Sequence, residues 1–248
     1  MGMGFEQERT QVPRAPWVDN LTLRMRRHFL LKLVGTTIFI GLFFIGYLHV
    51  LHHPAFAVTV MPLTALDALI AFQPQALYVY LTLWIYLGAG PGLQLTFLEL
   101  VAYAAWLSAL CLVGLSIFYW WPTQVPALSF DVSVHPGFQM LKGIDAAGNA
   151  CPSLHVAVAA FTLIRIRAVL RRIGAPAAFG WLNAAWFAAI AWSTLATKQH
   201  VVLDVVAGAL LGVAFAYPSL RWQPATGRSR PRYAARDEER LGRWARPR

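Results

Sequence analysis

The chain has 248 residues, of which 58% are apolar and only 13% are charged. A soluble domain usually has about 25% charged residues, and a soluble monomer of this size could not hide so much apolar surface from water. Together with a mean hydropathy of +0.52, the composition argues against an ordinary cytosolic enzyme and against disorder. It predicts a protein whose solvent is lipid. Two cysteines, Cys111 and Cys151, are too few for a disulfide scaffold.

Apolar stretches of roughly 20 residues, about the length of a membrane-spanning helix, recur along the chain. We therefore predict an all-α, polytopic membrane protein. It should have a basic arm at residues 1–28, a six-helix membrane domain at 29–220 and an Arg-rich tail at 221–248. The expected spans are residues 33–51, 77–90 with an extension back to Gln75, 93–119, 153–170, 177–197 and 201–217.

The basic residues are concentrated in three blocks. Of the 21 Lys and Arg, six lie in residues 1–32, four in 165–172 and nine in 221–248. With six spans, all three blocks face one compartment, and the positive-inside rule makes it the cytoplasm, with both termini there. The net charge of +10 is thus mainly a topology signal, to which contact of the tail with anionic lipid can add. No nucleic-acid partner is expected, because the tail has no recognition motif.

The opposite, outer face carries two long loops. Residues 52–75 combine prolines with an apolar patch and predict an amphipathic helix at the membrane interface. Residues 120–152 contain too many prolines for a regular helix. Functional groups are therefore expected to gather on the outer face.

The first polar segment on that face is Cys151-Pro-Ser-Leu-His155. Pro152 and Ser153 are typical of a helix start, so the fourth span should begin here with free backbone N–H groups and a positive dipole end. Such a helix start can bind an anion, and His155 lies within its first turn. A capped helix with a polar mouth and no ligand is the alternative for this segment alone.

The second segment, at the start of the sixth span, contains His200 and Asp204. Four residues apart, they share one helical face. A carboxylate about one turn into the membrane needs a partner, and the imidazole is the nearest one. The pairing would place a proton on Nδ1 and leave Nε2 free as a nucleophile or base. A structural His–Asp pair is the alternative, and close helix packing is expected further along this span, at Gly208-x3-Gly212.

Together these segments favour a phosphate site. Lys142 and Lys198, the two basic residues outside the three blocks, fall on the same face as the histidines. Zinc is a weaker interpretation, because a third well-placed ligand is missing and lysines disfavour a cation. We therefore expect no metal and no cofactor. Glu99 and Arg165 lie at similar depth near the other face and are interpreted as a structural ion pair.

The motifs resemble those of the type 2 phosphatidic acid phosphatase (PAP2) superfamily. Pro152-Ser-Leu-His155 is similar to its second motif, Pro-Ser-x-His, and Ser193-Thr194-x5-His200-x3-Asp204 is similar to its third, Ser-Arg-x5-His-x3-Asp. The residues of these two motifs, together with Trp121-Pro-Thr-Gln-Val-Pro126, resemble the branch of the superfamily that includes inositol phosphorylceramide synthases. Two of the motifs depart from the family pattern. Thr194 replaces the third-motif Arg, and the first motif, Lys-x6-Arg-Pro, is matched only in spacing, by Lys142 and Asn149.

The resemblance covers about residues 60–215 and implies a six-helix catalytic domain that performs a two-step, metal-independent transfer. His200 would attack phosphorus, Asp204 would orient it, and His155 would protonate the leaving alcohol and later deprotonate the acceptor. The oxygens of the phosphate would be held by Lys142, Ser153, Asn149 and Lys198.

The expected function is hydrolysis of a lipid phosphomonoester at the outer face of the membrane. The expected partners are this lipid phosphate substrate and the membrane lipids around the protein. The alternative is a phosphodiester head-group phosphotransferase. A remote alternative is a proton-coupled transporter that uses His200 and Asp204 as a relay. A transporter should scatter ionisable groups through the middle of the bundle, whereas here they cluster at one face.

Overall fold

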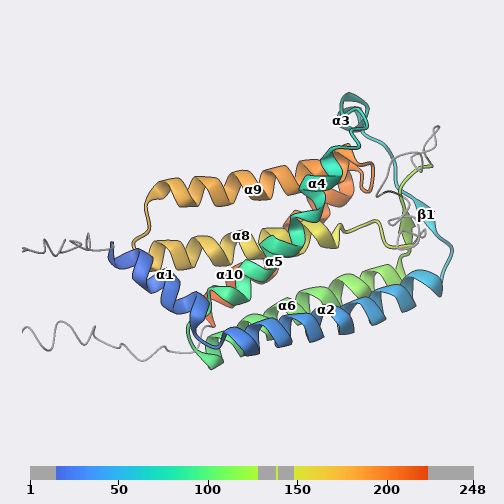
Figure 1. Cartoon of the computed structure of the whole chain (residues 1–248). Coiled ribbons are helices and arrows are strands. Elements are labelled where there is room, and N and C mark those ends of the chain that lie inside the picture. The colour runs from blue at the N-terminus through green and yellow to red at the C-terminus, as the bar shows by residue number, and fades with distance from the viewer. Residues whose placement is uncertain (1–14, 128–137, 139–147, 223–248) are drawn as a thin grey trace, which may run out of the picture.

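The computed structural model describes residues 15–127, 138 and 148–222 and is mainly helical (Figure 1). Lys142 and nearly all of the expected tail therefore lie outside the described residues. The elements in chain order are α1 (Pro16–Arg26), α2 (Phe29–His52), β1 (Thr59–Val60), α3 (Ala65–Leu69), α4 (Ala76–Leu81), α5 (Leu83–Gly92), α6 (Phe97–Trp120), β2 (Thr123–Gln124), α8 (Leu154–Arg172), α9 (Ala177–Ala196) and α10 (Val202–Arg221).

Helices occupy all six expected spans. Within the described parts of the chain, three of them, α2, α6 and α10, are long and apolar enough to cross a membrane. The second expected span is not one helix. It is divided into α4 and α5 at Thr82, whose hydroxyl donates to the carbonyl of Val79 at 2.6 Å and accepts from Trp186 Nε1 at 3.0 Å.

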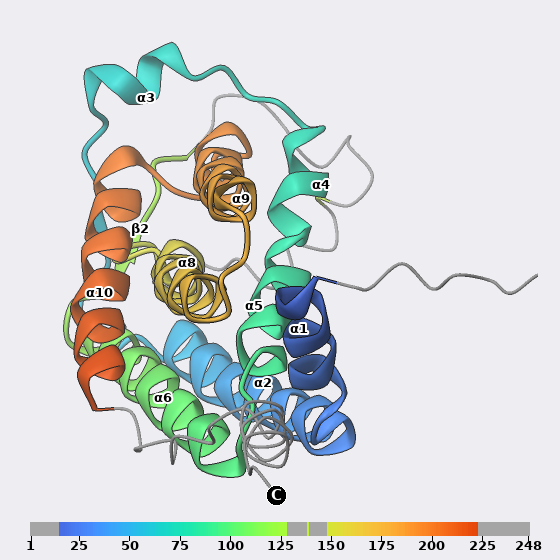
Figure 2. The ribbon, with the colours of Figure 1, turned by 90° about the vertical axis from the view of Figure 1, so that its left-hand side faces the viewer.

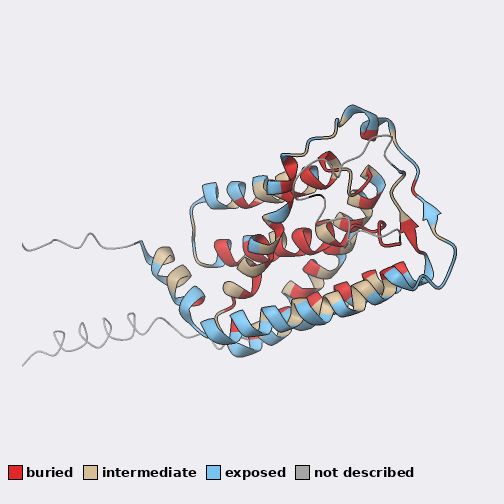
Figure 3. Ribbon diagram, turned by 45° about the vertical axis from the view of Figure 1, so that its right-hand side comes forward, coloured by how far each residue is buried: buried red, intermediate tan, exposed pale blue. Residues whose placement is uncertain are grey.

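The central helix of the bundle is α8. In the end-on view of Figure 2 it lies between α9, α10, α5 and α6, and it contacts all four. Its residues 156–162 are all buried, and Figure 3 shows that buried residues gather on this helix, while α2 is largely exposed. The exposed side chains of α2 include Leu30, Leu42 and Ile45, as expected for a helix that faces lipid.

The backbones of α8 and α10 touch. A Cβ atom at Gly208 would lie 2.3 Å from the carbonyl oxygen of Ser153, and one at Gly212 would lie 2.3 Å from that of Ala157. Only glycine permits this approach, so the close packing predicted from Gly208-x3-Gly212 is confirmed. It places the starts of the two helices side by side. We call this end of the bundle the site end.

The loops at the site end also pair. Thr59 and Val60 of β1 align in parallel with Thr123 and Gln124 of β2. Helix α3 follows β1 and is only five residues long. Its Leu66 and Leu69 are exposed, whereas Asp67 is buried. This is the position where the sequence predicts an amphipathic interfacial helix.

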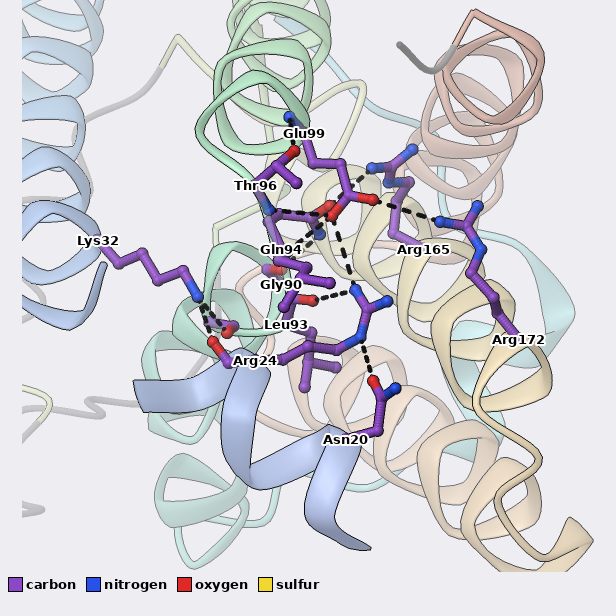
Figure 4. Close-up of polar contacts among 12 residues, drawn as sticks. Asn20, Arg24, Lys32, Gly90, Leu93, Gln94, Thr96, Glu99, Arg165 and Arg172 are labelled. Atoms are coloured by element: carbon purple, nitrogen blue, oxygen red, sulfur yellow. Dashed lines mark hydrogen bonds and ion pairs between the residues drawn. The ribbon is translucent and has the colours of Figure 1, made fainter. Parts of the chain in front are cut away.

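The other end, which we call the arm end, contains a buried polar cluster around Glu99 (Figure 4). The Glu99 carboxylate accepts from the backbone N–H of Leu95 at 2.7 Å and pairs with Arg24 at 3.6 Å and Arg172 at 3.4 Å. Arg165, which the sequence paired with Glu99, donates instead to the Gln94 side chain and to the Ser219 carbonyl. The Glu99 cluster comprises Arg24, Lys32, Gln94, Glu99, Arg165, Arg172 and Ser219.

This cluster corrects the interpretation of Glu99 for a physical reason. Depth along a helix can be counted from the sequence, but the direction of a side chain around α8 cannot. The carboxylate is reached by Arg172, seven residues after Arg165, and by Arg24 of α1. Part of the expected N-terminal arm therefore packs into the bundle, because Arg24 is buried and donates to the carbonyl of Leu93 at 3.1 Å.

Candidate active site

The two histidines meet at the site end. His155 lies in the first turn of α8, and His200 precedes α10 by two residues. Their ring centroids are 6.0 Å apart. The contact between the helix starts is reinforced by a hydrogen bond from the backbone N–H of Ser153 to the carbonyl of Asp204, at 3.0 Å.

Each helix start is capped by a residue of the site. Ser153 is the N-cap of α8, and its hydroxyl accepts from the N–H of Val156 at 3.4 Å. Asp204 Oδ2 accepts from the N–H of Val201 at 3.0 Å, so this carboxylate folds back over the start of α10. Capping of this kind uses N–H groups that a helix leaves unpaired. It also fixes where the two side chains lie.

Asp204 stands behind His200. Nδ1 of His200 lies 3.5 Å from Asp204 Oδ2, and both side chains are buried. The contact is longer than a well-formed hydrogen bond, and among the described residues neither His200 Nδ1 nor Asp204 Oδ1 has a hydrogen-bond partner. Catalytic hydrogen bonds are often long before substrate binds. The arrangement leaves Nε2, the other ring nitrogen, as the one directed away from the carboxylate.

The structure adds an aromatic wall that the sequence did not reveal. The ring of Tyr80, on α4, lies 4.6 Å from that of His155, and its hydroxyl is 3.5 Å from His155 Nδ1. Trp84, on α5, meets His155 edge-on at 6.5 Å. No motif marks either residue. The two residues lie on either side of Thr82, where α4 ends and α5 begins.

A second contact missed by sequence reasoning fastens α3 to the segment 198–202, which contains His200. Asp67 Oδ1 accepts from the N–H of Val202, the first residue of α10, at 2.8 Å. Lys198 Nζ donates to the carbonyls of Asp67 at 3.2 Å and Ile70 at 2.5 Å. Burial works to raise the pKa of Asp67, but hydrogen bonds from Thr64 and Val202, with nearby Lys198, leave it below its ordinary value. The carboxylate therefore stays ionised and holds the turn.

The predicted phosphate ligands differ in their surroundings. Ser153 lies at the start of α8, two residues before His155, and its backbone N–H bonds the carbonyl of Asp204. Lys198 is engaged by α3, as described above. The Asn149 side chain donates to the carbonyl of Tyr47 at 3.3 Å. Lys142 lies outside the described residues.

Thr194, at the position of the family Arg, points back into its own helix. Its hydroxyl donates to the carbonyl of Ala191 at 2.8 Å. Its own carbonyl accepts from the N–H of His200 at 3.2 Å. Thr194 thus supports the turn that leads to His200 through its backbone carbonyl.

The described part of the chain holds no group of three or more His, Cys, Asp or Glu arranged to bind a metal ion.

A family model described as the PAP2 superfamily matches residues 75–217, more than half of the chain. The chain belongs to the PAP2 superfamily. The matched segment runs from α4 into α10 and contains both histidines and Asp204, whereas Asp67 and α3 precede it. Neither the curated proteins nor the solved structures contain a significant match. Membership suggests phosphatase- or phosphotransferase-type chemistry, and the inositol phosphorylceramide synthase-like branch stays a prediction.

Proposed function

We propose that the chain is a membrane enzyme that hydrolyses a lipid phosphomonoester through a phosphohistidine at His200. The observation that carries the proposal is the placement of His155 and His200 at 6.0 Å, with Asp204 behind His200. One histidine can then attack phosphorus while the other handles the proton of the leaving group. The superfamily match supports the same chemistry.

In the first step, Nε2 of His200 attacks phosphorus and the bond from phosphorus to the lipid oxygen breaks. His155 gives its proton to that oxygen, so the leaving group departs as an alcohol. In the second step, His155 takes a proton from water while the water oxygen attacks phosphorus, and the phosphorus–nitrogen bond breaks. Inorganic phosphate leaves and His200 is restored. Asp204 keeps the proton on Nδ1 and stabilises the charged ring.

The phosphate would be held at the start of α8. The N–H groups of the first turn and the hydroxyl of Ser153 supply donors there. Lys142, Asn149 and Lys198 remain proposed ligands. For Lys198, direct contact requires its ammonium group to leave the carbonyls of Asp67 and Ile70. If Lys198 instead acts by holding α3 against the segment that contains His200, its ammonium group need not move.

One observation favours the phosphodiester alternative. A phosphomonoester carries up to two negative charges and a diester carries one, so a diester needs fewer cations around it. Thr194 replaces the family Arg and bonds its own helix, and the ammonium of Lys198 is engaged elsewhere. In that reaction a lipid or polyol hydroxyl would replace water as acceptor, with the same roles for His155 and His200. This is the activity of the inositol phosphorylceramide synthase-like branch.

The proposed topology has six crossings, both termini in the cytoplasm and the site at the outer face. The three spans that qualify by length and composition and the three basic blocks support it. In a background without Cys111 and Cys151, a cysteine at Gln199 should react with an impermeant thiol reagent in intact cells. A cysteine at Arg171 should not. If the cysteine at position 171 reacts and the one at position 199 does not, the proposed orientation in the membrane is reversed.

The function is tested with purified protein, several labelled lipid phosphomonoesters and phosphodiesters, and reactions with and without alcohol acceptors. Hydrolysis of a monoester to phosphate supports the first proposal, and transfer from a diester only when an alcohol is present supports the second. An alkali-stable, acid-labile phosphoprotein that His200→Ala cannot form is expected in both. Activity that disappears with EDTA and returns with zinc would reject the phosphohistidine route.

A further inference from the structure

A groove opens on the outside of the bundle between α2, α5 and α6, toward the arm end. Its volume is about 200 Å³. Its described lining residues are almost all apolar, and Lys32 is the only charged one among them. On α6 the lining extends from Phe97 to Leu107, about 15 Å at 1.5 Å per residue. This is roughly the depth of hydrocarbon in one leaflet.

The groove reaches the Glu99 cluster. Lys32 belongs to both, because its side chain lines the groove and its ammonium donates to the carbonyls of Arg24 and Gly92. An ammonium group has three donors, so these two bonds leave a third. The end of the groove at Lys32, which we call its head, is therefore cationic, while the walls of the groove are apolar.

The Glu99 cluster has more positive than negative charge. Among the described residues, it brings four cationic side chains, those of Arg24, Lys32, Arg165 and Arg172, around one carboxylate, that of Glu99 (Figure 4). Three of the four cations are buried, and Nε of Arg165 has no hydrogen-bond partner among the described residues. Buried charge of one sign is unfavourable unless a counterion approaches.

We propose that this groove binds one acyl chain of an anionic phospholipid, whose phosphate lies against Lys32 and the neighbouring arginines. The ligand chemistry follows from the two parts of the site: an apolar channel as deep as one leaflet and a cationic head. On the proposed topology this lipid belongs to the cytoplasmic leaflet. The binding does not depend on the chemistry at His200, so it can fail without affecting the proposed function.

The chain offers a matched pair of substitutions on α2. Gly35 lines the groove, and a Cβ there would meet none of the described atoms within 4 Å. The phenyl group of Gly35→Phe can therefore enter the groove without displacing the backbone. Gly41 is equally open but is not among the lining residues. Gly41→Phe is thus the control for a bulky aromatic side chain on the same helix.

The test is mass spectrometry of the intact, delipidated chain released from detergent with equal amounts of dioleoyl-phosphatidylglycerol and dioleoyl-phosphatidylcholine. The unsubstituted chain and Gly41→Phe should retain one phosphatidylglycerol in preference to phosphatidylcholine. Gly35→Phe should lose most of that adduct. Lys32→Gln should lose the preference for the anionic lipid.

Two results would overturn the proposal. One is equal retention of the two lipids by the unsubstituted chain, because the cationic head would then select nothing. The other is a phosphatidylglycerol adduct in Gly35→Phe as strong as in Gly41→Phe. If Gly35→Phe does not fold, Ala104→Phe fills the groove from the α6 wall, where Ala104 is exposed, and the same two outcomes decide.

Discussion

The two ends of the bundle bury ionisable side chains in different ways. At the arm end, the Glu99 carboxylate has a backbone N–H at 2.7 Å and two arginines within 3.6 Å. At the site end, Asp204 has one backbone N–H at 3.0 Å, an imidazole at 3.5 Å and the thiol of Cys151 nearby. Within the described residues, its second oxygen has no hydrogen-bond partner.

This difference separates structure from chemistry. A buried carboxylate that only stabilises a fold is best served by fixed, close partners, because an unpaired one is costly. A group that must change its charge or partner during a reaction needs an unfilled position. We therefore expect substitutions at the site end to act mainly on rate and substitutions at the arm end to act mainly on stability.

The largest expected effect is that of His200→Ala. It should abolish turnover and the phosphoenzyme on every substrate, because the ring that we propose as the site of the covalent intermediate is gone. Activity is measured as phosphate release from the lipid ester and as the nitrophenol burst from p-nitrophenyl phosphate. A burst that survives in His200→Ala would show that another group is the nucleophile.

The second effect distinguishes the two histidines. A general acid typically contributes about 10²–10⁴-fold, and a lipid alkoxide needs that help far more than p-nitrophenolate does. His155→Ala should therefore lose a factor in this range on the lipid ester. With p-nitrophenyl phosphate it should still give a burst, followed by accumulation of phosphohistidine, because the acceptor is no longer activated.

Tyr80→Phe is the matched control for His155. It keeps the ring that lies 4.6 Å from the imidazole and removes only the hydroxyl near Nδ1. Its loss of rate should be much smaller than that of His155→Ala. Equal inactivity of a folded His155→Ala on both esters would assign His155 to phosphate binding instead.

The third effect tests whether the touching backbones of α8 and α10 align the site. In Gly208→Ala the new Cβ would lie 2.3 Å from the carbonyl oxygen of Ser153, so the helices must separate. A misplacement of about 1 Å can reduce a rate by about 10²-fold, and overpacking destabilises by about 1–3 kcal/mol. We expect kcat and the unfolding temperature in detergent to fall together. Gly180→Ala, where a Cβ meets no described atom within 4 Å, should lower neither.

Much of this arrangement could be predicted from local sequence. Hydropathy located the helices, and Gly208-x3-Gly212 predicted close packing of the last span, whose partner the structure identifies as α8. The segments with His155 and His200 were expected on one face, and the structure brings those two rings together. These predictions worked because each depends on a short stretch of chain with a clear period or motif.

The contacts that escaped prediction join segments far apart in the sequence. Tyr80 reaches His155, 75 residues later, and Asp67 caps a helix that begins 135 residues after it. Arg24 looked like part of a separate basic arm, yet it packs against Glu99. Side-chain direction and loop path decide these contacts, and neither has a signal in composition or spacing.

Glu99→Gln is expected to have the smallest effect on rate but a large effect on stability. Removing one partner of a buried ion pair destabilises by about 3–5 kcal/mol, because the remaining charge stays buried. Here Arg24 would remain, with a side chain only 5% exposed. The unfolding temperature in detergent should therefore fall strongly, while kcat at a temperature where the protein is folded should stay close to the original value.

Arg172→Gln is the control that makes this test specific. It removes another ion pair of the same carboxylate, but the Arg172 side chain is 44% exposed, and exposed pairs contribute only about 0–1 kcal/mol. It should lower the unfolding temperature much less than Glu99→Gln does. A folded Glu99→Gln that loses kcat as severely as His155→Ala would mean that the arm end takes part in the reaction. His155 and Arg172 lie about 25 Å apart along α8 at 1.5 Å per residue, so the side chains of the arm end do not touch the histidines. Such a loss of kcat would therefore overturn the contrast between the two ends.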